Sequence, residues 1–229
     1  MKGKLLHRIW ATYREGGVRL VAQKSLCTLH CEAVLYALDL ERDLPEVSSD
    51  VLLEARELSA SEVHRYVALR PEEEAVEVLA RLRDGHVCCA TWDGERIVGW
   101  AWVRFDRMWV SEISKSISLR SGEVYGYDSY TDPEYRERGA ASMRAAALIR
   151  YVTRLGYGQL VAYVMRENTA GRAAIETLGF VRSGRIRWLH VGRFGIEVRT
   201  GRAIPPRVGV HVQPRPGRAG TAVVDLSTR

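Results

Sequence analysis

The sequence lacks any long hydrophobic run, although 46% of its 229 residues are hydrophobic. A helix needs about 20 consecutive apolar residues to span a bilayer. The N-terminus does not read as a signal peptide either, because Lys2 and Lys4 are followed by only two leucines before His7 and Arg8. We therefore expect a globular protein that stays in the cytoplasm.

Cysteine is scarce, with four residues in the chain. Cys88 and Cys89 are adjacent on an expected strand, where neighbouring side chains point to opposite faces and rarely form a disulfide. Cys27, His30 and Cys31 have no fourth ligand at a recognisable spacing. The expectation is reduced, buried thiols and no metal site.

The net charge of +6 comes from the two ends of the chain. Residues 1–25 carry +5 and residues 200–229 carry +4, which leaves −3 for residues 26–199. Nucleic acid is therefore not expected as a partner of the domain as a whole, although binding of DNA by both basic ends is an alternative. Residues 3–25 can form a basic amphipathic helix that contacts a membrane surface, packs in a homodimer or caps its own domain.

Composition divides the chain into three regions. Residues 1–50 predict a basic helical N-terminal extension, in which 26–45 continues the first helix. Residues 51–201 predict the globular domain, without internal repeats. Residues 202–229 form a tail rich in Pro, Gly and Arg that cannot be a packed helix; within it Val208, Val210 and Val212 could add one edge strand, and 213–229 is expected to be loose.

Turn and cap signals in the globular domain predict the element order β-α-α-β-β-β-α-β-α-β-β. This order combines antiparallel hairpins with one βαβ unit, so the fold class is α/β with a mixed (α+β) sheet and helices on both faces. Residues 106–121 are expected to form a mobile loop or an irregular edge. The predicted strands are 51–56, 86–91, 96–105, 123–131, 159–165, 180–191 and 194–200, and the helices are 61–69, 71–85, 136–155 and 169–178.

The most informative segment is the turn that follows strand 123–131. Pro133 forces a turn, and a helix then starts at a run of small residues, Gly139-Ala140-Ala141. A helix start offers free backbone N–H groups and a positive dipole end, and small residues let a phosphate approach the backbone. Arg136 and Arg138 add positive charge. The pattern predicts a pyrophosphate site; the alternative is an ordinary helix start with exposed arginines.

The helix after this turn is predicted to bury one stripe against the sheet and to expose the other. The buried stripe is expected to contain Ala141, Ala145, Leu148, Val152 and Leu155, and the other face Arg144, Arg150 and Arg154.

The segment Arg136-Glu137-Arg138-Gly139-Ala140-Ala141 resembles the Arg/Gln-x-x-Gly-x-Gly/Ala motif of the GNAT superfamily of acyl-CoA-dependent N-acyltransferases. Asn168, eleven residues before Gly179-Phe180, is similar to the Asn that precedes that family's second helix. The resemblance covers roughly residues 51–199, with its specific motifs in 123–180. It implies a GNAT-type acyltransferase fold, here with a helical N-terminal extension, and acetyl-CoA or another acyl-CoA as cosubstrate, without a metal.

The resemblance also implies roles for individual residues. Strands 123–131 and 159–165 should splay apart and admit the thioester, while the strand end pairs with the pantetheine arm as an added strand. The implied cofactor-binding residues are Tyr130 and Thr131 for pantetheine, Arg136, Arg138, Gly139, Ala140 and Ala141 for the pyrophosphate, and Asn168 near the thiol.

The sequence offers several candidates for the proton-transfer groups. The family often has a Tyr as general acid at the position of Ile175, which cannot donate a proton. A base must deprotonate the attacking ammonium, and the candidates are Tyr127, by placement, and Glu123 and Asp128, by chemistry. Glu123 and Tyr127 share one strand face, while Asp128 faces the other way unless a bulge reverses it.

The function implied is transfer of an acetyl or related acyl group from acyl-CoA to an amine of a small molecule, such as an amino sugar or another cell-envelope precursor. Residues 59–85 and 106–121 are expected to shape the acceptor site. Two alternatives stay open. One is an N-acyltransferase that uses a long-chain acyl-CoA or an acyl carrier protein, and the other is a non-catalytic acyl-CoA-binding module, in keeping with Ile175.

Overall fold

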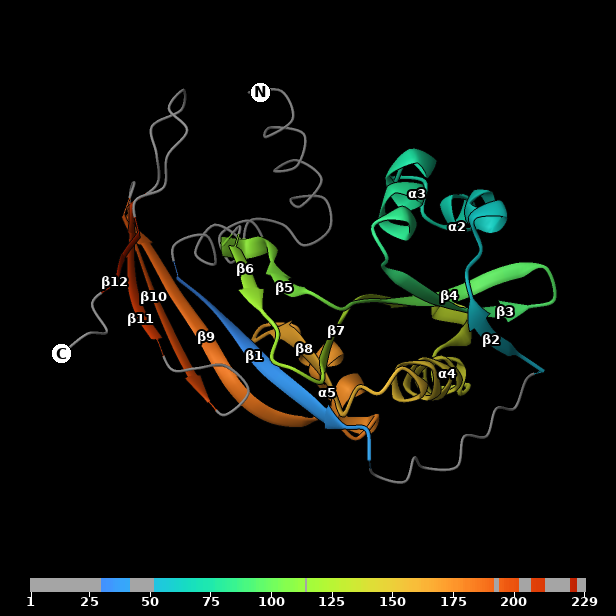
Figure 1. Cartoon of the computed structure of the whole chain (residues 1–229). Coiled ribbons are helices and arrows are strands. Elements are labelled where there is room, and N and C mark those ends of the chain that lie inside the picture. Colours follow the sequence, from blue (N-terminus) through green and yellow to red (C-terminus); the bar gives the residue numbers. More distant parts are fainter. Residues whose placement is uncertain are drawn as a thin grey trace. The chain divides into compact units, whose positions relative to one another are not determined.

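The computed structural model divides the chain into two compact units, which are described separately (Figure 1). The described residues are 30–41, 52–113, 115–191, 194–201, 207–212 and 223–225. The larger unit contains residues 36–163 and 170–182, and the smaller unit contains 1–35, 164–169 and 183–229. The predicted basic helix 3–25 lies outside the described residues.

A mixed sheet forms the frame of the larger unit and confirms the predicted fold class. Strands β2, β3, β4 and β7 pair antiparallel in this order, and β8 joins β7 in parallel. The strands are β2 (Glu54–Glu57), β3 (Val87–Asp93), β4 (Arg96–Arg104), β7 (Glu123–Thr131) and β8 (Gln159–Met165).

Helices cover both faces of this sheet (Figure 1). On one face lie α2 (Val63–Leu69), which follows a short 3-10 turn at Ala60–Glu62, and α3 (Ala75–Arg83); on the other lies α4 (Ala140–Arg154). Because both faces are covered, residues 88–92 of β3 are all buried and show no polar alternation. Helix α5 (Thr169–Thr177) is linked to strand β1 (His30–Asp39), because the Tyr36 hydroxyl donates to Glu176 at 2.7 Å.

Two predictions about regular structure were wrong. Residues 30–39 form β1 rather than part of a helix; Ala33–Leu38 are all buried, so the segment has no alternation by which a strand could be told from a buried helix. Within 106–121, β5 (Arg107–Val110) and β6 (Lys115–Ser118) pair as a hairpin, with a 3-10 turn at Ser111–Ile113, rather than forming a mobile loop or an irregular edge.

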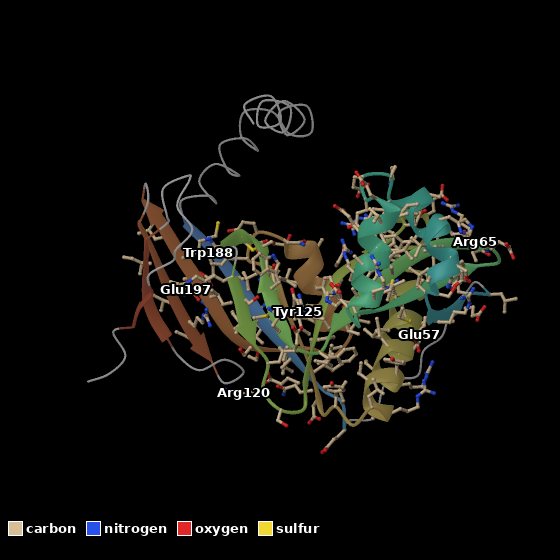
Figure 2. All side chains as sticks on the ribbon, turned by 45° about the horizontal axis from the view of Figure 1, so that its top comes forward. Glu57, Arg65, Arg120, Tyr125, Trp188 and Glu197 are labelled. Atoms are coloured by element: carbon tan, nitrogen blue, oxygen red, sulfur yellow. The ribbon has the colours of Figure 1, made fainter. Side chains whose placement is uncertain are left out.

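The smaller unit contains a meander of antiparallel strands. These are β9 (Val181–Val191), β10 (Phe194–Gly201), β11 (Arg207–Val212) and β12 (Val223–Asp225). Trp188 and Glu197 face each other across β9 and β10, and both are buried (Figure 2). Strand β11 confirms the predicted strand at 208–212, but β12 pairs with its other side, so it is not the edge. The prediction that all of 213–229 is loose was wrong for the same reason.

No helix in the described part of the chain is long and apolar enough to cross a membrane.

Arg144 was predicted on the exposed face of α4, and the structure shows that this was wrong. Its side chain is 2% exposed, whereas Leu155, predicted to be buried, is 54% exposed. The Arg144 guanidinium donates to three hydroxyl oxygens, those of Thr91 at 3.2 Å, Ser129 at 3.3 Å and Thr131 at 3.1 Å. It thereby ties α4 to strands β3 and β7.

Gly99 on β4 makes room for this guanidinium. A Cβ atom at position 99 would lie 2.6 Å from an Arg144 nitrogen and 2.8 Å from the Tyr130 carbonyl oxygen. The carbonyl oxygen belongs to the backbone, and the guanidinium nitrogen is buried and hydrogen-bonded. Moving either atom therefore costs free energy.

We expect Gly99→Ala to lower the free energy of unfolding by about 1–3 kcal/mol, because the added methyl group overpacks the sheet. Urea denaturation measures this loss. Gly158→Ala is the matched control, since a Cβ there meets nothing within 4 Å, and we expect a change within about 0.5 kcal/mol. Equal losses in the two variants would contradict the tight fit at Gly99.

Candidate functional site

The turn between β7 and α4 is held in place by side-chain hydrogen bonds. Asp132 accepts from the backbone N–H of Glu134 at 3.1 Å and from Arg96 at 2.7 Å. The Tyr135 hydroxyl donates to Asp93 at 2.6 Å. Residues 133–135 form a single 3-10 turn with Pro133 at its start, where a fixed φ and a missing N–H are tolerated. The turn therefore has a defined shape before any ligand binds.

The backbone after this turn has the conformation of an anion site. Glu137 and Gly139 both have positive φ, 63° and 80°, and α4 begins directly afterwards at Ala140. Left-handed residues beside a helix start turn successive N–H groups towards one point, where the helix dipole is also positive. Glu137 adopts a conformation that costs a non-glycine residue of order 1 kcal/mol, as is common where a loop is shaped for a ligand.

The residues predicted for the pyrophosphate lie together at this turn, in 136–141. Arg136 and Arg138 are exposed at the turn; Arg136 also donates to the Thr131 carbonyl oxygen at 3.2 Å. Ala140 is 1% exposed and packs against Leu53 and Val98. The small side chain at position 140 therefore serves the contact between helix and sheet.

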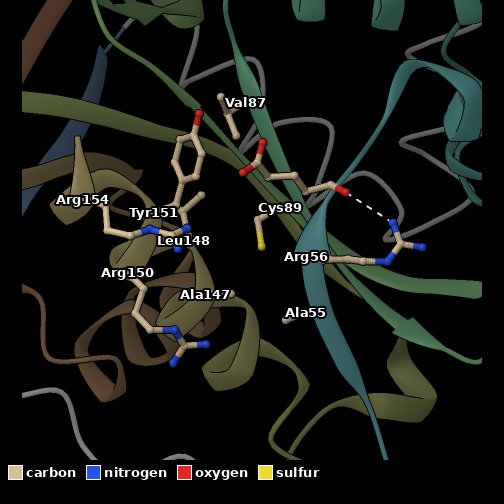
Figure 3. A pocket seen from close by; sticks show the side chains of 10 residues that line it. Ala55, Arg56, Val87, Cys89, Ala147, Leu148, Arg150, Tyr151 and Arg154 are labelled. Carbon is tan, nitrogen blue, oxygen red and sulfur yellow. Dashed lines mark hydrogen bonds between the residues drawn. The ribbon is translucent and has the colours of Figure 1, made fainter.

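A separate cavity of about 270 Å³ lies between β2 and the second half of α4 (Figure 3). Its lining includes Ala147, Arg150 and Arg154 from the helix and Ala55 and Glu57 from the strand. Ala147 is seven residues after Ala140, roughly 10 Å along the helix. The cavity is thus distinct from the turn at the start of α4.

Among the described residues, the second half of strand β7 has no ladder partner on one backbone edge. It pairs in parallel with β8 at three positions only, Glu123, Val124 and Tyr125, and continues to Thr131 while β4 occupies its opposite edge. An open strand edge can accept an extended chain as an added strand. This is the geometry expected where the two strands splay apart.

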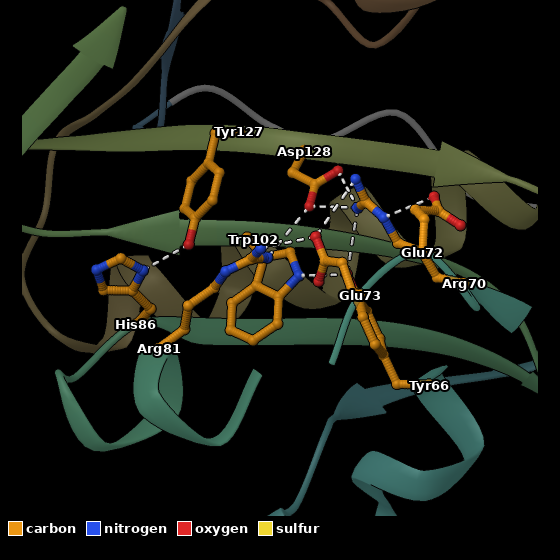
Figure 4. A network of polar contacts seen from close by, with 9 residues as sticks. All are labelled: Tyr66, Arg70, Glu72, Glu73, Arg81, His86, Trp102, Tyr127 and Asp128. Carbon is orange, nitrogen blue, oxygen red and sulfur yellow. Dashed lines mark hydrogen bonds and ion pairs between the residues drawn. The ribbon is translucent and has the colours of Figure 1, made fainter. Parts of the chain in front are cut away.

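A bulge reverses the direction of Asp128, which is the exception allowed by the sequence. Trp102 pairs with Tyr127 and Trp100 with Tyr130, so β7 has one residue more than β4 between these pairs. Asp128 takes up the extra residue with φ of 48°. Tyr127 and Asp128 both contact residues on the α2/α3 side as a result (Figure 4). Tyr130 stacks on Trp100 on the same side.

Asp128 is the centre of an ion-pair network (Figure 4). Both of its oxygens accept from Arg70 at 2.5 Å, and one accepts from Arg81 at 3.3 Å. Glu73 accepts from Arg81 at 2.7 Å, while its second oxygen is buried without a hydrogen-bond partner in the described part of the chain. The two arginines lie over the rings of Trp100 and Trp102. The Asp128 carboxylate is therefore already engaged by two cations.

Within the larger unit, Glu123 lies apart from this network. Glu123 begins β7, roughly 16 Å along the strand from Asp128, and its carboxylate accepts from the backbone N–H of Arg120 at 2.8 Å. Asn168 belongs to the smaller unit, directly before α5. No three His, Cys, Asp or Glu residues in the described ranges are grouped so that they could hold a metal ion.

Sequence reasoning missed four residues of the network and its surroundings. Arg70, Glu73, Arg81 and His86 come from α2, α3 and the loops beside them, and nothing in their spacing points to β7. The sequence held one indication of these residues, because 70–74 is rich in charged side chains and precedes a short helix. The same pattern fits an ordinary helix N-terminus.

We expect Asp128→Asn to lower the free energy of unfolding by about 1–3 kcal/mol, because the half-buried Arg70 guanidinium loses its charge partner. Asn tolerates the left-handed backbone at this position, so the variant isolates the charge. Glu72→Gln is the control in urea denaturation: the Glu72 side chain is 68% exposed in its ion pair with Arg70, and the expected loss is below about 0.5 kcal/mol. A loss in Asp128→Asn no larger than the small loss expected for Glu72→Gln would show that the ion pairs of Asp128 do not stabilise the fold.

Similar solved structures give weak likenesses. The aminoglycoside N-acetyltransferase AAC(6')-Iy in complex with CoA is 20% identical over 56% of this chain and 92% of its own, with a TM-score of 0.46. A Staphylococcus epidermidis protein of unknown function is 12% identical over 74% of this chain, with a TM-score of 0.49. A Drosophila protein is 16% identical over 74% of this chain, with a TM-score of 0.46. The chain spans 65% and 54% of the last two proteins.

The sequence comparison is more informative than these structural likenesses. No curated protein matches the chain significantly. Residues 53–180 match the model of the Acetyltransferase (GNAT) family, and this range includes β7, the turn after it and α4. Since the match covers more than half of the sequence, the chain belongs to the GNAT acetyltransferase family.

Proposed function

We propose that this protein transfers an acetyl or related acyl group from acyl-CoA to the amine of a small molecule, by direct attack of the amine on the thioester. The observation that carries the proposal is the turn at 136–141 at the start of α4, within the matched family range. Its N–H groups and two exposed arginines suit a pyrophosphate, and the open edge of β7 suits the pantetheine arm.

The cofactor would bind along β7 and then across the turn. Backbone groups of Tyr130 and Thr131 would pair with pantetheine, while Arg136, Arg138 and the amides of Gly139, Ala140 and Ala141 would hold the pyrophosphate. Asn168 is proposed to contact the cofactor near its thiol. In this arrangement the thioester lies in the gap beyond Tyr125, where the ladder to β8 ends.

The acceptor would bind on the α2/α3 side of β7, beside the β5–β6 hairpin. The buried oxygen of Glu73 that has no hydrogen-bond partner in the described residues is a suitable acceptor for an ammonium or hydroxyl group. The rings of Tyr127 and Tyr130 are partly buried on this face and pack against the core cluster that contains Trp100; aromatic rings attract cations. An amino sugar fits both features.

The cofactor site predicts that Gly139→Glu lowers the affinity for CoA about 100-fold or more, because it places a negative charge where the diphosphate approaches. Isothermal titration calorimetry measures this. Gly139→Gln is the matched control, with similar bulk and the same unfavourable positive φ but no charge, and should bind more tightly than the Glu variant. Unchanged binding in the Glu variant would overturn the site.

The proposed reaction predicts that the full-length chain releases CoA from acetyl-CoA only in the presence of a suitable amine. A panel of amino sugars, aminoglycosides and polyamines, with detection of free thiol and mass spectrometry of the product, tests it. Binding of CoA in calorimetry without turnover of any amine would contradict the transferase and favour a binding module, in keeping with Ile175.

A further inference from the structure

Tyr127 and His86 form a hydrogen-bonded pair beside the proposed thioester position (Figure 4). Tyr127 lies two residues past Tyr125, the last position of β7 that pairs with β8. His86 directly precedes β3. The Tyr127 hydroxyl oxygen is 2.5 Å from His86 Nδ1, and the two rings meet edge to face with centroids 5.7 Å apart. The pair links the end of the β7–β8 ladder to the surface loop after α3.

The surroundings fix the protonation states of this pair at neutral pH. Burial raises the pKa of Tyr127 above its usual 10, so the phenol keeps its proton. Burial, reinforced by Arg104, lowers the pKa of His86 below 6.5, so the imidazole is neutral. The charged groups that face His86 are Arg104, Asp106, Asp84 and Arg81. The Tyr127 O–H therefore donates to Nδ1.

We propose that Tyr127 and His86 act together as the base of the proposed reaction, with Tyr127 as the catalytic residue and His86 as the group that takes its proton. The inference rests on the proposed function. One proton of the substrate ammonium passes to the Tyr127 oxygen while the Tyr127 proton passes to His86 Nδ1, which frees the lone pair of the amine nitrogen. The nitrogen then attacks the thioester carbonyl and the N–C bond forms. The C–S bond breaks, the proton left on the nitrogen passes to the CoA thiolate, and the His86 imidazolium releases its proton to water.

The other candidates are less suited to this step. Both oxygens of Asp128 already accept from Arg70. The Glu123 carboxylate is buried and accepts from the backbone N–H of Arg120. His86 is half-buried, so its ring can exchange a proton with solvent. A phenol that does not ionise can still transfer a proton, provided that a neutral base takes the phenol's own proton at the same time.

Kinetics over a range of pH tests the pair. At pH 7 we expect Tyr127→Phe and His86→Gln each to lower kcat by roughly 10²–10⁴, and the double variant to be no worse than either, because the two residues act as one unit. The loss should shrink at alkaline pH, where the amine loses its proton without help. Tyr151→Phe on α4, the helix that covers the other face of the sheet, should leave kcat unchanged.

A titration of His86 by NMR tests the pairing without turnover. In the full-length protein, the His86 signal, identified by its absence in His86→Gln, should titrate below 6.5 and move upward in Tyr127→Phe, because the neutral imidazole loses its hydrogen-bond donor. An unmoved His86 titration would overturn the pair. So would full activity of both variants across the pH range while the wild type acetylates an amine. If the wild type acetylates no amine, the proposed function falls and the relay with it.

Discussion

The buried Arg144 guanidinium is the constraint on which the site geometry depends. A cation removed from water is costly unless it is well hydrogen-bonded, and in the described structure its partners are three hydroxyl groups rather than a carboxylate. Burial accordingly lowers the pKa of Arg144 to about 10. Two of the hydroxyls, those of Ser129 and Thr131, lie between the bulge at Asp128 and the turn that begins at Asp132. The arginine thus fixes the short stretch of β7 from which both parts of the proposed site are built.

Because of the bulge, the side chains of β7 make different contacts on the two faces of the sheet. Ser129 and Thr131 are committed to Arg144 on the α4 side, while Tyr127 and Asp128 both contact groups on the α2/α3 side. In a regular strand these last two side chains would point in opposite directions. The extra residue places a proton-transfer pair and an ion-pair network side by side, next to the edge proposed for the cofactor.

The sequence predicted the elements whose pattern is local and missed the contacts that join distant segments. Strands β7 and β8 have the predicted bounds, because turn residues mark their ends. Strand β1 was missed because burial on both sides removes alternation. Arg144 was misplaced because the alanines of α4 fit a buried or an exposed stripe equally well, so the helix could be rotated without conflict. The pairing of His86 with Tyr127 spans 41 positions, and only the folded sheet brings the two together.

The fit between Gly99 and Arg144 restricts the order in which this part of the protein can change over evolution. A side chain at position 99 destabilises the fold while the arginine is present, and loss of the arginine first would leave three inward hydroxyls without this donor. Either substitution alone destabilises the fold, so we expect selection against it before the second substitution can compensate. Related sequences should therefore keep both residues or replace both, and intermediates with one of the two should be rare.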